Sequence, residues 1–201
     1  YNLIDGIDGL AGGLGVIASF VFGLIFLFND DAQYAILSFT LLGALLAFLK
    51  YNFNPASIFM GDTGSLVIGL IFSILSIRLI NEGVNIPNDQ QYVNKGPFIS
   101  IVILAIPLFD TFRVFFIRIF SGYHPLRPDR NHIHHALLDL GLGHKKSTLI
   151  LYTYSVIIAF LSYFMIDMSL GLSIFLLSII VLGSMSIPFI LIRIKKKKSE
   201  K

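Results

Sequence analysis

Two aspartates near the start of the chain have the type and spacing of a metal or phosphate site. Asp5 and Asp8 lie three positions apart, and each is followed by a glycine, Gly6 and Gly9. Carboxylate oxygens are hard ligands that suit Mg²⁺ or Mn²⁺, and glycine permits tight turns and close approach of a ligand. A helix cap would explain one of these aspartates well but not both. The pattern therefore favours a ligand site.

A third aspartate, Asp62, comes directly before another apolar run. A helix N-terminus favours an anion because its free N–H groups and its dipole are positive. The same residue could equally be a simple cap. Phe59, three positions earlier, is an aromatic side chain that could stack on a base or anchor at the membrane interface.

Three of the five histidines, His132, His134 and His135, fall within four positions. Neutral imidazole suits zinc, but no cysteine completes such a site and the nearby carboxylates are hard-metal ligands. With Arg127 and Arg130 adjacent, the cluster is better suited to holding phosphate oxygens. A solvated polar loop is the alternative.

Asp110 interrupts an apolar run, where an ionisable residue suggests a function. Arg113, at i+3, lies on the same helix face and could pair with it. A structural ion pair and a catalytic role both stay open.

The rest of the chain indicates what positions these residues. Of 201 residues, 55% are hydrophobic and 13% charged, about half the charged share of a soluble domain. This composition excludes a disordered chain, and the lack of cysteine excludes thiol catalysis and a disulfide scaffold. We expect an all-α, polytopic membrane protein.

Six stretches approach the 20 or so apolar residues that cross a bilayer. Pro107 and Pro188 could each kink a span without removing it from the membrane. The predicted spans are Leu10–Phe28, Ala32–Tyr51, Thr63–Asn81, Phe98–Phe120, Leu149–Ile166 and Ser169–Ile192.

An even number of spans places both termini on one side of the membrane. Of the fifteen basic residues, only Arg78 and Lys95 then lie on the opposite side. Cytoplasmic loops carry such an excess. Both termini and the three polar segments that carry the motifs, 1–9, 51–63 and 121–147, are therefore predicted to be cytoplasmic. Because topology explains the basic surplus, nucleic acid is not an expected partner.

Carboxylates, an aromatic residue and a histidine–arginine cluster on one face fit Mg²⁺-assisted handling of a diphosphate beside a lipid. One substrate would be an anionic lipid from the bilayer and the other a water-soluble phosphorylated compound. A cation or phosphate transporter is the alternative from another class, but transporters place their sites near the midplane. A purely structural membrane subunit would not need three such motifs.

Three motifs resemble a known family: Asn2-x-x-Asp5-Gly6-x-Asp8-Gly9, Asn54-Pro55-Ala56-x-x-Phe59-Met60-Gly61-Asp62 and His132-x-His134-His135. The order of these motifs along the chain, and their predicted position on one face of the membrane, are similar to those of the polyprenyl-phosphate N-acetylhexosamine-1-phosphate transferases, which are of the glycosyltransferase 4 type. The resemblance implies transfer of a sugar-1-phosphate from a UDP-sugar to undecaprenyl phosphate with release of UMP, the first membrane step of a cell-surface glycan pathway. It further implies a bacterial inner-membrane protein, often dimeric. Asn54-Pro55 and His-x-His-His resemble the N-acetylglucosamine-1-phosphate branch more than the phospho-N-acetylmuramoyl-pentapeptide branch.

The resemblance also implies roles for individual residues. Asp62 would be the Mg²⁺ ligand, or that of Mn²⁺, with Asn2 beside the metal. Asp5 and Asp8 would line the nucleotide and diphosphate site. Phe59 would stack on uracil, with Asn52 and Gly6 near it, while the diphosphate would be held by Arg130, His132, His134 and His135.

The family has a further aspartate-rich motif upstream of the Asn2 motif, and nothing precedes Tyr1 here. Asp30-Asp31 is no substitute, because its following residues differ and it falls on the outer face. We therefore expect a C-terminal portion of a longer protein, inactive alone, in which residues 1–192 are membrane domain and 193–201 a basic cytoplasmic tail.

Overall fold

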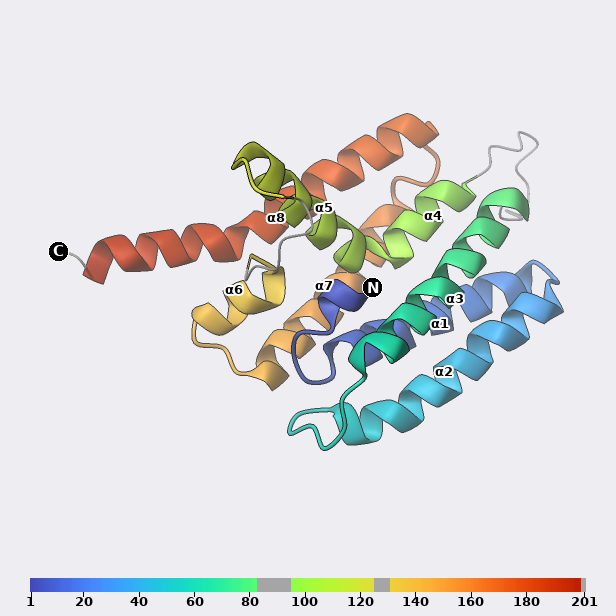
Figure 1. Ribbon diagram of the computed structural model, residues 1–201. Helices are drawn as coiled ribbons and strands as arrows, with labels where there is room; N and C mark the ends of the chain where they lie inside the picture. The colour runs from blue at the N-terminus through green and yellow to red at the C-terminus, as the bar shows by residue number, and fades with distance from the viewer. Residues whose placement is uncertain (83–94, 125–130, 200–201) are drawn as a thin grey trace.

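The computed structural model describes residues 1–82, 95–124 and 131–199, and within these ranges the chain is helical with no strand. A short 3₁₀ turn, η1, precedes eight α-helices (Figure 1). Their bounds are η1 Asn2–Ile4, α1 Leu10–Phe28, α2 Ala32–Asn52, α3 Gly61–Glu82, α4 Gly96–Ile103, α5 Ala105–Phe120, α6 Ile133–Asp139, α7 His144–Tyr163 and α8 Leu170–Ser199.

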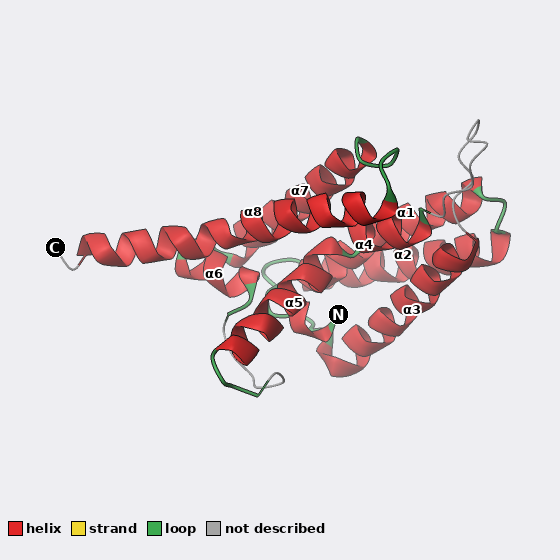
Figure 2. Cartoon of the chain, turned by 90° about the horizontal axis from the view of Figure 1, so that it is seen from above, coloured by secondary structure: helices red, strands yellow, loops and turns green. Residues whose placement is uncertain are grey.

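Five of these helices, α1, α2, α3, α7 and α8, are long and apolar enough to cross a membrane. The bent pair of α4 and α5 makes a sixth candidate span (Figure 2). The predicted all-α membrane fold is therefore confirmed, and each predicted span coincides with one of these helices or with the bent pair.

The fourth predicted span is broken by a turn of 81° between α4 and α5. Its cause lies at Pro107, which has no N–H to donate to the carbonyl of Ile103. Regular bonding resumes one residue later, where the Leu108 N–H donates to the Leu104 carbonyl at 3.0 Å. Pro188 behaves differently, because α8 runs through it without a break.

Helix α1 lies at the centre of the molecule and packs against α2, α3, α4 and α7. Its glycines permit this close packing. A Cβ added at Gly13 would lie 1.7 Å from the Tyr152 hydroxyl oxygen of α7, and one at Gly15 would lie 2.8 Å from a Leu45 methyl group of α2. Larger residues would push both neighbouring helices away from α1.

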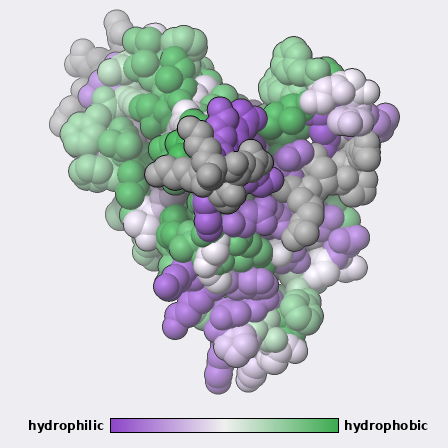
Figure 3. Space-filling model, turned by 90° about the vertical axis from the view of Figure 1, so that its left-hand side faces the viewer, coloured by the Kyte–Doolittle hydropathy of each residue, from purple (hydrophilic) through white to green (hydrophobic). Residues whose placement is uncertain are grey.

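Hydrophilic residues gather at one end of the molecule. Figure 3, which views the end from which α8 projects, shows them in a band between two hydrophobic lobes. The last turns of α8 belong to this end, and Arg193 and Lys195 to Lys197 are exposed there. The predicted basic tail thus begins as a continuation of α8 rather than as a separate segment.

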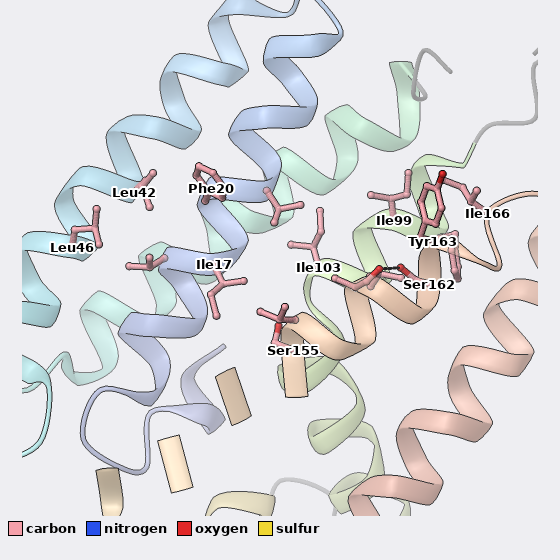
Figure 4. Close-up of a pocket in the computed structure, with 16 residues that line it drawn as sticks. Ile17, Phe20, Leu42, Leu46, Ile99, Ile103, Ser155, Ser162, Tyr163 and Ile166 are labelled. Carbon is pink, nitrogen blue, oxygen red and sulfur yellow. Dashed lines mark hydrogen bonds between the residues drawn. The ribbon is translucent and has the colours of Figure 1, made fainter. Parts of the chain in front are cut away.

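A cavity of about 830 Å³ lies among α1, α2, α4 and α7 (Figure 4). Aliphatic and aromatic side chains form its wall, and Ser155, Ser162 and Tyr163 supply the only side-chain polar groups of that lining. None of the described residues of the three polar segments lines it. Phosphate or metal chemistry therefore has to be sought at the hydrophilic end.

Candidate active site

The first polar segment is a loop that α7 holds in place. Gly9 has a left-handed φ of +77°, which glycine adopts without strain, and this turns the chain into α1. From α7, the Thr148 hydroxyl donates to the Asp8 carbonyl at 2.9 Å, and the Tyr152 hydroxyl donates to the Gly9 carbonyl. The loop that carries both aspartates is thus fixed to a membrane helix.

Asn52, at the end of α2, joins this loop to the second polar segment. Its Oδ1 accepts from the Gly9 N–H at 3.1 Å, and its Nδ2 donates to the Ile58 carbonyl at 2.9 Å. The side chain is 3% exposed. We predicted Asn52 near a bound base; the structure gives its amide a positioning role between two backbone segments, and direct contact with a base stays a prediction.

Asp8 is the second link between the segments. Its Oδ2 accepts from the Asn54 side-chain amide at 2.8 Å and from the Ala56 N–H at 3.3 Å, and its Oδ1 lies 3.3 Å from His144 Nδ1. Burial raises the pKa of Asp8, but these hydrogen bonds and His144 outweigh it and leave the pKa below its usual range. Asp8 is therefore an anion at neutral pH. Nothing in the sequence indicated this contact of His144, because no other polar motif residue stands near His144 in the chain.

Asp5, Asp62 and Asn2 come together at the start of α3. Burial first, and then the charge of Asp62, raise the pKa of Asp5, so the two carboxylates are close enough to repel one another. Asp62 is exposed in the first turn of α3, and the Asn2 Oδ1 accepts from the Ser65 hydroxyl of that helix at 2.5 Å. An added cation would relieve this repulsion.

These oxygens fit Mg²⁺ better than zinc. Within the described ranges, no three His, Cys, Asp or Glu side chains are grouped to hold a metal ion by themselves. Mg²⁺ does not need such a cage, since it usually binds through one or two carboxylates plus substrate phosphates and water. A structural zinc ion does need one, so the zinc interpretation of the histidine segment loses its support.

The histidine segment packs on the first loop. His134 is 2% exposed, and a Cβ added at Gly6 would lie 2.1 Å from its Nε2. The His134 ring is nearly parallel to that of His132, with centroids 5.7 Å apart, and lies 4.3 Å from that of His135. Burial, followed by the neighbouring His135, lowers the pKa of His134 to about 4, so this imidazole is neutral at pH 7.

Asp110, whose role the sequence left open, anchors this segment. It is 1% exposed, and its carboxylate accepts from Arg113 at 3.0 Å, from the Ile133 N–H at 3.0 Å and from His132 Nδ1 at 2.8 Å. The ion pair with Arg113 is confirmed, and it is part of a larger network.

Two predicted residues stand apart from these contacts. Phe59 is 76% exposed in the loop before α3, where its ring is free to meet a ligand. Arg130 lies outside the described residues, as do its neighbours Arg127 and Asp129.

Sequence comparison places this arrangement among known proteins. Residues 1–80, which contain the first two polar segments, match the sequence model of glycosyl transferase family 4. The predicted resemblance is thereby confirmed.

Similar proteins match most of the chain. The probable undecaprenyl-phosphate N-acetylglucosaminyl 1-phosphate transferase of Bacillus subtilis is 37% identical over 181 residues, 90% of this chain and 48% of its own length. The decaprenyl-phosphate N-acetylglucosaminephosphotransferase of Mycolicibacterium smegmatis is 37% identical over 171 residues, 79% of this chain and 42% of its length. The undecaprenyl-phosphate alpha-N-acetylglucosaminyl 1-phosphate transferase of Escherichia coli K12 is 31% identical over 164 residues, which are 79% of this chain and 42% of its own length. The chain spans about half the length of these relatives.

Proposed function

We propose that the protein containing this chain transfers N-acetylglucosamine-1-phosphate from UDP-N-acetylglucosamine to undecaprenyl phosphate and releases UMP. The observation that carries the proposal is the contact of His134 with Gly6. It places the histidine segment against the loop of Asp5 and Asp8, so groups suited to a metal and groups suited to phosphates meet at one end of a membrane protein. The activities named for the relatives supply the sugar phosphate and the polyprenyl phosphate.

Mg²⁺, or Mn²⁺, would be held by Asp62 and Asp5, with the Asn2 side-chain oxygen beside them. When bound, the ion would neutralise the charge of the phosphate oxygens. Burial and the negative charge of Asp62 both raise the pKa of Asp5, and this accumulation of carboxylates favours a divalent cation.

The chain's own side chains would bind and orient the two substrates. His134 is neutral at pH 7, so it offers phosphate a hydrogen bond rather than a charge. Phe59 would stack on the uracil, since its ring is exposed beside Asp62 in the sequence. The positive-inside distribution of Lys and Arg supports a cytoplasmic position for this end of the molecule, and the bacterial relatives support a bacterial inner membrane as its location.

The test uses the full gene product with radiolabelled UDP-N-acetylglucosamine, undecaprenyl phosphate and Mg²⁺. Label is expected in the lipid fraction together with an equal amount of UMP. Asp62→Asn should lower the rate by about 100-fold or more, because a metal contributes several kcal/mol to such a transfer. It should also weaken Mn²⁺ binding measured by electron paramagnetic resonance, which does not depend on turnover.

Asp167→Asn is the matched control, because Asp167 is exposed in the turn between α7 and α8, at the opposite end of these helices. Full transfer by the Asp62→Asn protein would refute the metal assignment. Transfer from UDP-N-acetylmuramoyl-pentapeptide instead of UDP-N-acetylglucosamine would refute the choice of donor.

A further inference from the structure

The carboxylate of Asp110 is buried at the start of the histidine segment and accepts three hydrogen bonds. Arg113 and the Ile133 N–H both donate to Oδ1, each at 3.0 Å, while Oδ2 lies 2.8 Å from His132 Nδ1. Asp110 is 1% exposed and His132 is 5% exposed, so water does not compete for these contacts. Such buried, charge-assisted hydrogen bonds hold a defined geometry.

This geometry determines which nitrogen of His132 carries a proton. An ionised carboxylate only accepts hydrogen bonds, so the proton between it and His132 must reside on Nδ1. In the neutral ring, Nε2 is then the unprotonated atom, and it is the one left for other partners.

Neighbouring contacts prevent the segment from shifting. Arg113 also donates to the Asn131 carbonyl, so Asn131, His132 and Ile133 are all tied to α5. The Arg113 guanidinium lies 4.1 Å from the ring centroid of Phe189, which adds α8 to the same cluster.

The His132 ring is connected to the first loop through one intervening ring. It lies parallel to His134, at an angle of 7° and a centroid distance of 5.7 Å, and His134 in turn contacts Gly6. A rotation of His132 would therefore be transmitted to the surface that faces Asp5 and Asp8.

We propose that Asp110 is a positioning residue: it holds His132 with Nδ1 protonated, so that the lone pair of Nε2 accepts a hydrogen bond from a protonated oxygen (P–OH) of a substrate phosphate. The orientation of the ring rests on the contacts above. The identity of the ligand, a protonated phosphate oxygen, rests on the proposed function. Asp110 itself touches no substrate and acts only through His132.

The experiment uses the full gene product with ¹⁵N-labelled histidine in nanodiscs. Histidine ring ¹⁵N shifts distinguish the two tautomers, and the His132 signals are assigned by their loss in His132→Gln. We expect Nδ1–H in the wild type. In Asp110→Asn the amide oxygen can still accept hydrogen bonds from Arg113 and the Ile133 N–H. The NH₂ group then points toward His132 Nδ1 and donates to it, so the ring proton of His132 should move to Nε2.

The same variant is then assayed for transfer. Loss of a residue that orients an active side chain typically costs 10- to 100-fold, so kcat should fall by about that factor while KM for UDP-N-acetylglucosamine changes little. Asp139→Asn is the matched control, because it makes the same chemical change at an exposed position of α6.

Three results would contradict parts of this proposal, and they are distinguishable. An Nε2–H tautomer in the wild type would overturn the orientation of His132, whether or not Asp110→Asn folds. A changed tautomer with an unchanged kcat would overturn the positioning role. An Nδ1–H wild-type ring in a gene product without transferase activity would leave the orientation standing and refute the proposed function.

Discussion

Gly6→Ala tests whether the first loop and the histidine segment form one site. A Cβ at this position would lie 2.1 Å from His134 Nε2, and ordinary contact begins at 3.4 Å, so the ring has to move by about 1.3 Å. The ring has little space to do so, because it is 2% exposed and packs between His132 and His135. The backbone at Gly6 is not left-handed, so alanine adds no strain of its own.

The expected cost of this substitution follows from that displacement. Overpacking of this kind costs about 1–3 kcal/mol of stability, and misplacing a reacting group by about 1 Å can cost about 100-fold in rate. The assays are the melting temperature of the full gene product in detergent and its kcat for transfer. We expect both to fall.

A double-mutant cycle identifies the cause of the loss. In a His134→Ala background the added methyl group meets no ring, so Gly6→Ala should cost less than about 0.5 kcal/mol there. Gly143→Ala serves as control, since a Cβ at Gly143 would meet nothing within 4 Å. An equal cost of Gly6→Ala with and without the His134 ring would refute the reasoning.

Two further predictions concern buried polar side chains. The pKa of His134 is about 4 in the fold, against about 6.5 in an unfolded chain. The unfolded state therefore takes up a proton first as pH falls, and the folded protein should lose on the order of 3 kcal/mol between pH 6.5 and 4. His134→Gln should flatten that part of the curve of melting temperature against pH; an unchanged slope would contradict the lowered pKa. Lys95 is 6% exposed, and its Nζ donates to the Met168 carbonyl at 2.6 Å. Lys95→Met should cost about 1–3 kcal/mol because this carbonyl loses its donor, whereas Lys145→Met, at an exposed position, should cost little. Equal melting temperatures of the two variants would show that the Lys95 contact is not stabilising.

The spans could be predicted from the sequence because each one must match the thickness of the bilayer, a constraint that acts on composition alone. The break of the fourth span could be predicted only in part, since Pro107 predicts a kink but not an 81° turn at Leu104. The predicted span Ser169–Ile192 did not indicate how far α8 continues beyond the apolar run, which is to Ser199. Lysines are good helix formers, and outside the membrane nothing requires the helix to end where the apolar run ends.

The candidate site could be predicted as three local motifs but not as an assembly. Asp5, Asp62 and the histidines each stand in a recognisable pattern. By contrast, the contacts of His144 with Asp8, of His132 with Asp110 and of His134 with Gly6 join residues far apart in the chain. Such contacts depend on how helices pack, and no local pattern encodes them.

One side-chain amide couples two parts of this molecule mechanically. Asn52 holds the Gly9 N–H and the Ile58 carbonyl at once, and Asn54 adds a bond to Asp8. The loop of Phe59 and the loop of the first two aspartates are therefore a single rigid piece. A ligand that displaced Phe59 would also move Asp5 and Asp8. A substrate whose base fitted poorly against Phe59 would therefore leave its phosphates misaligned with these carboxylates.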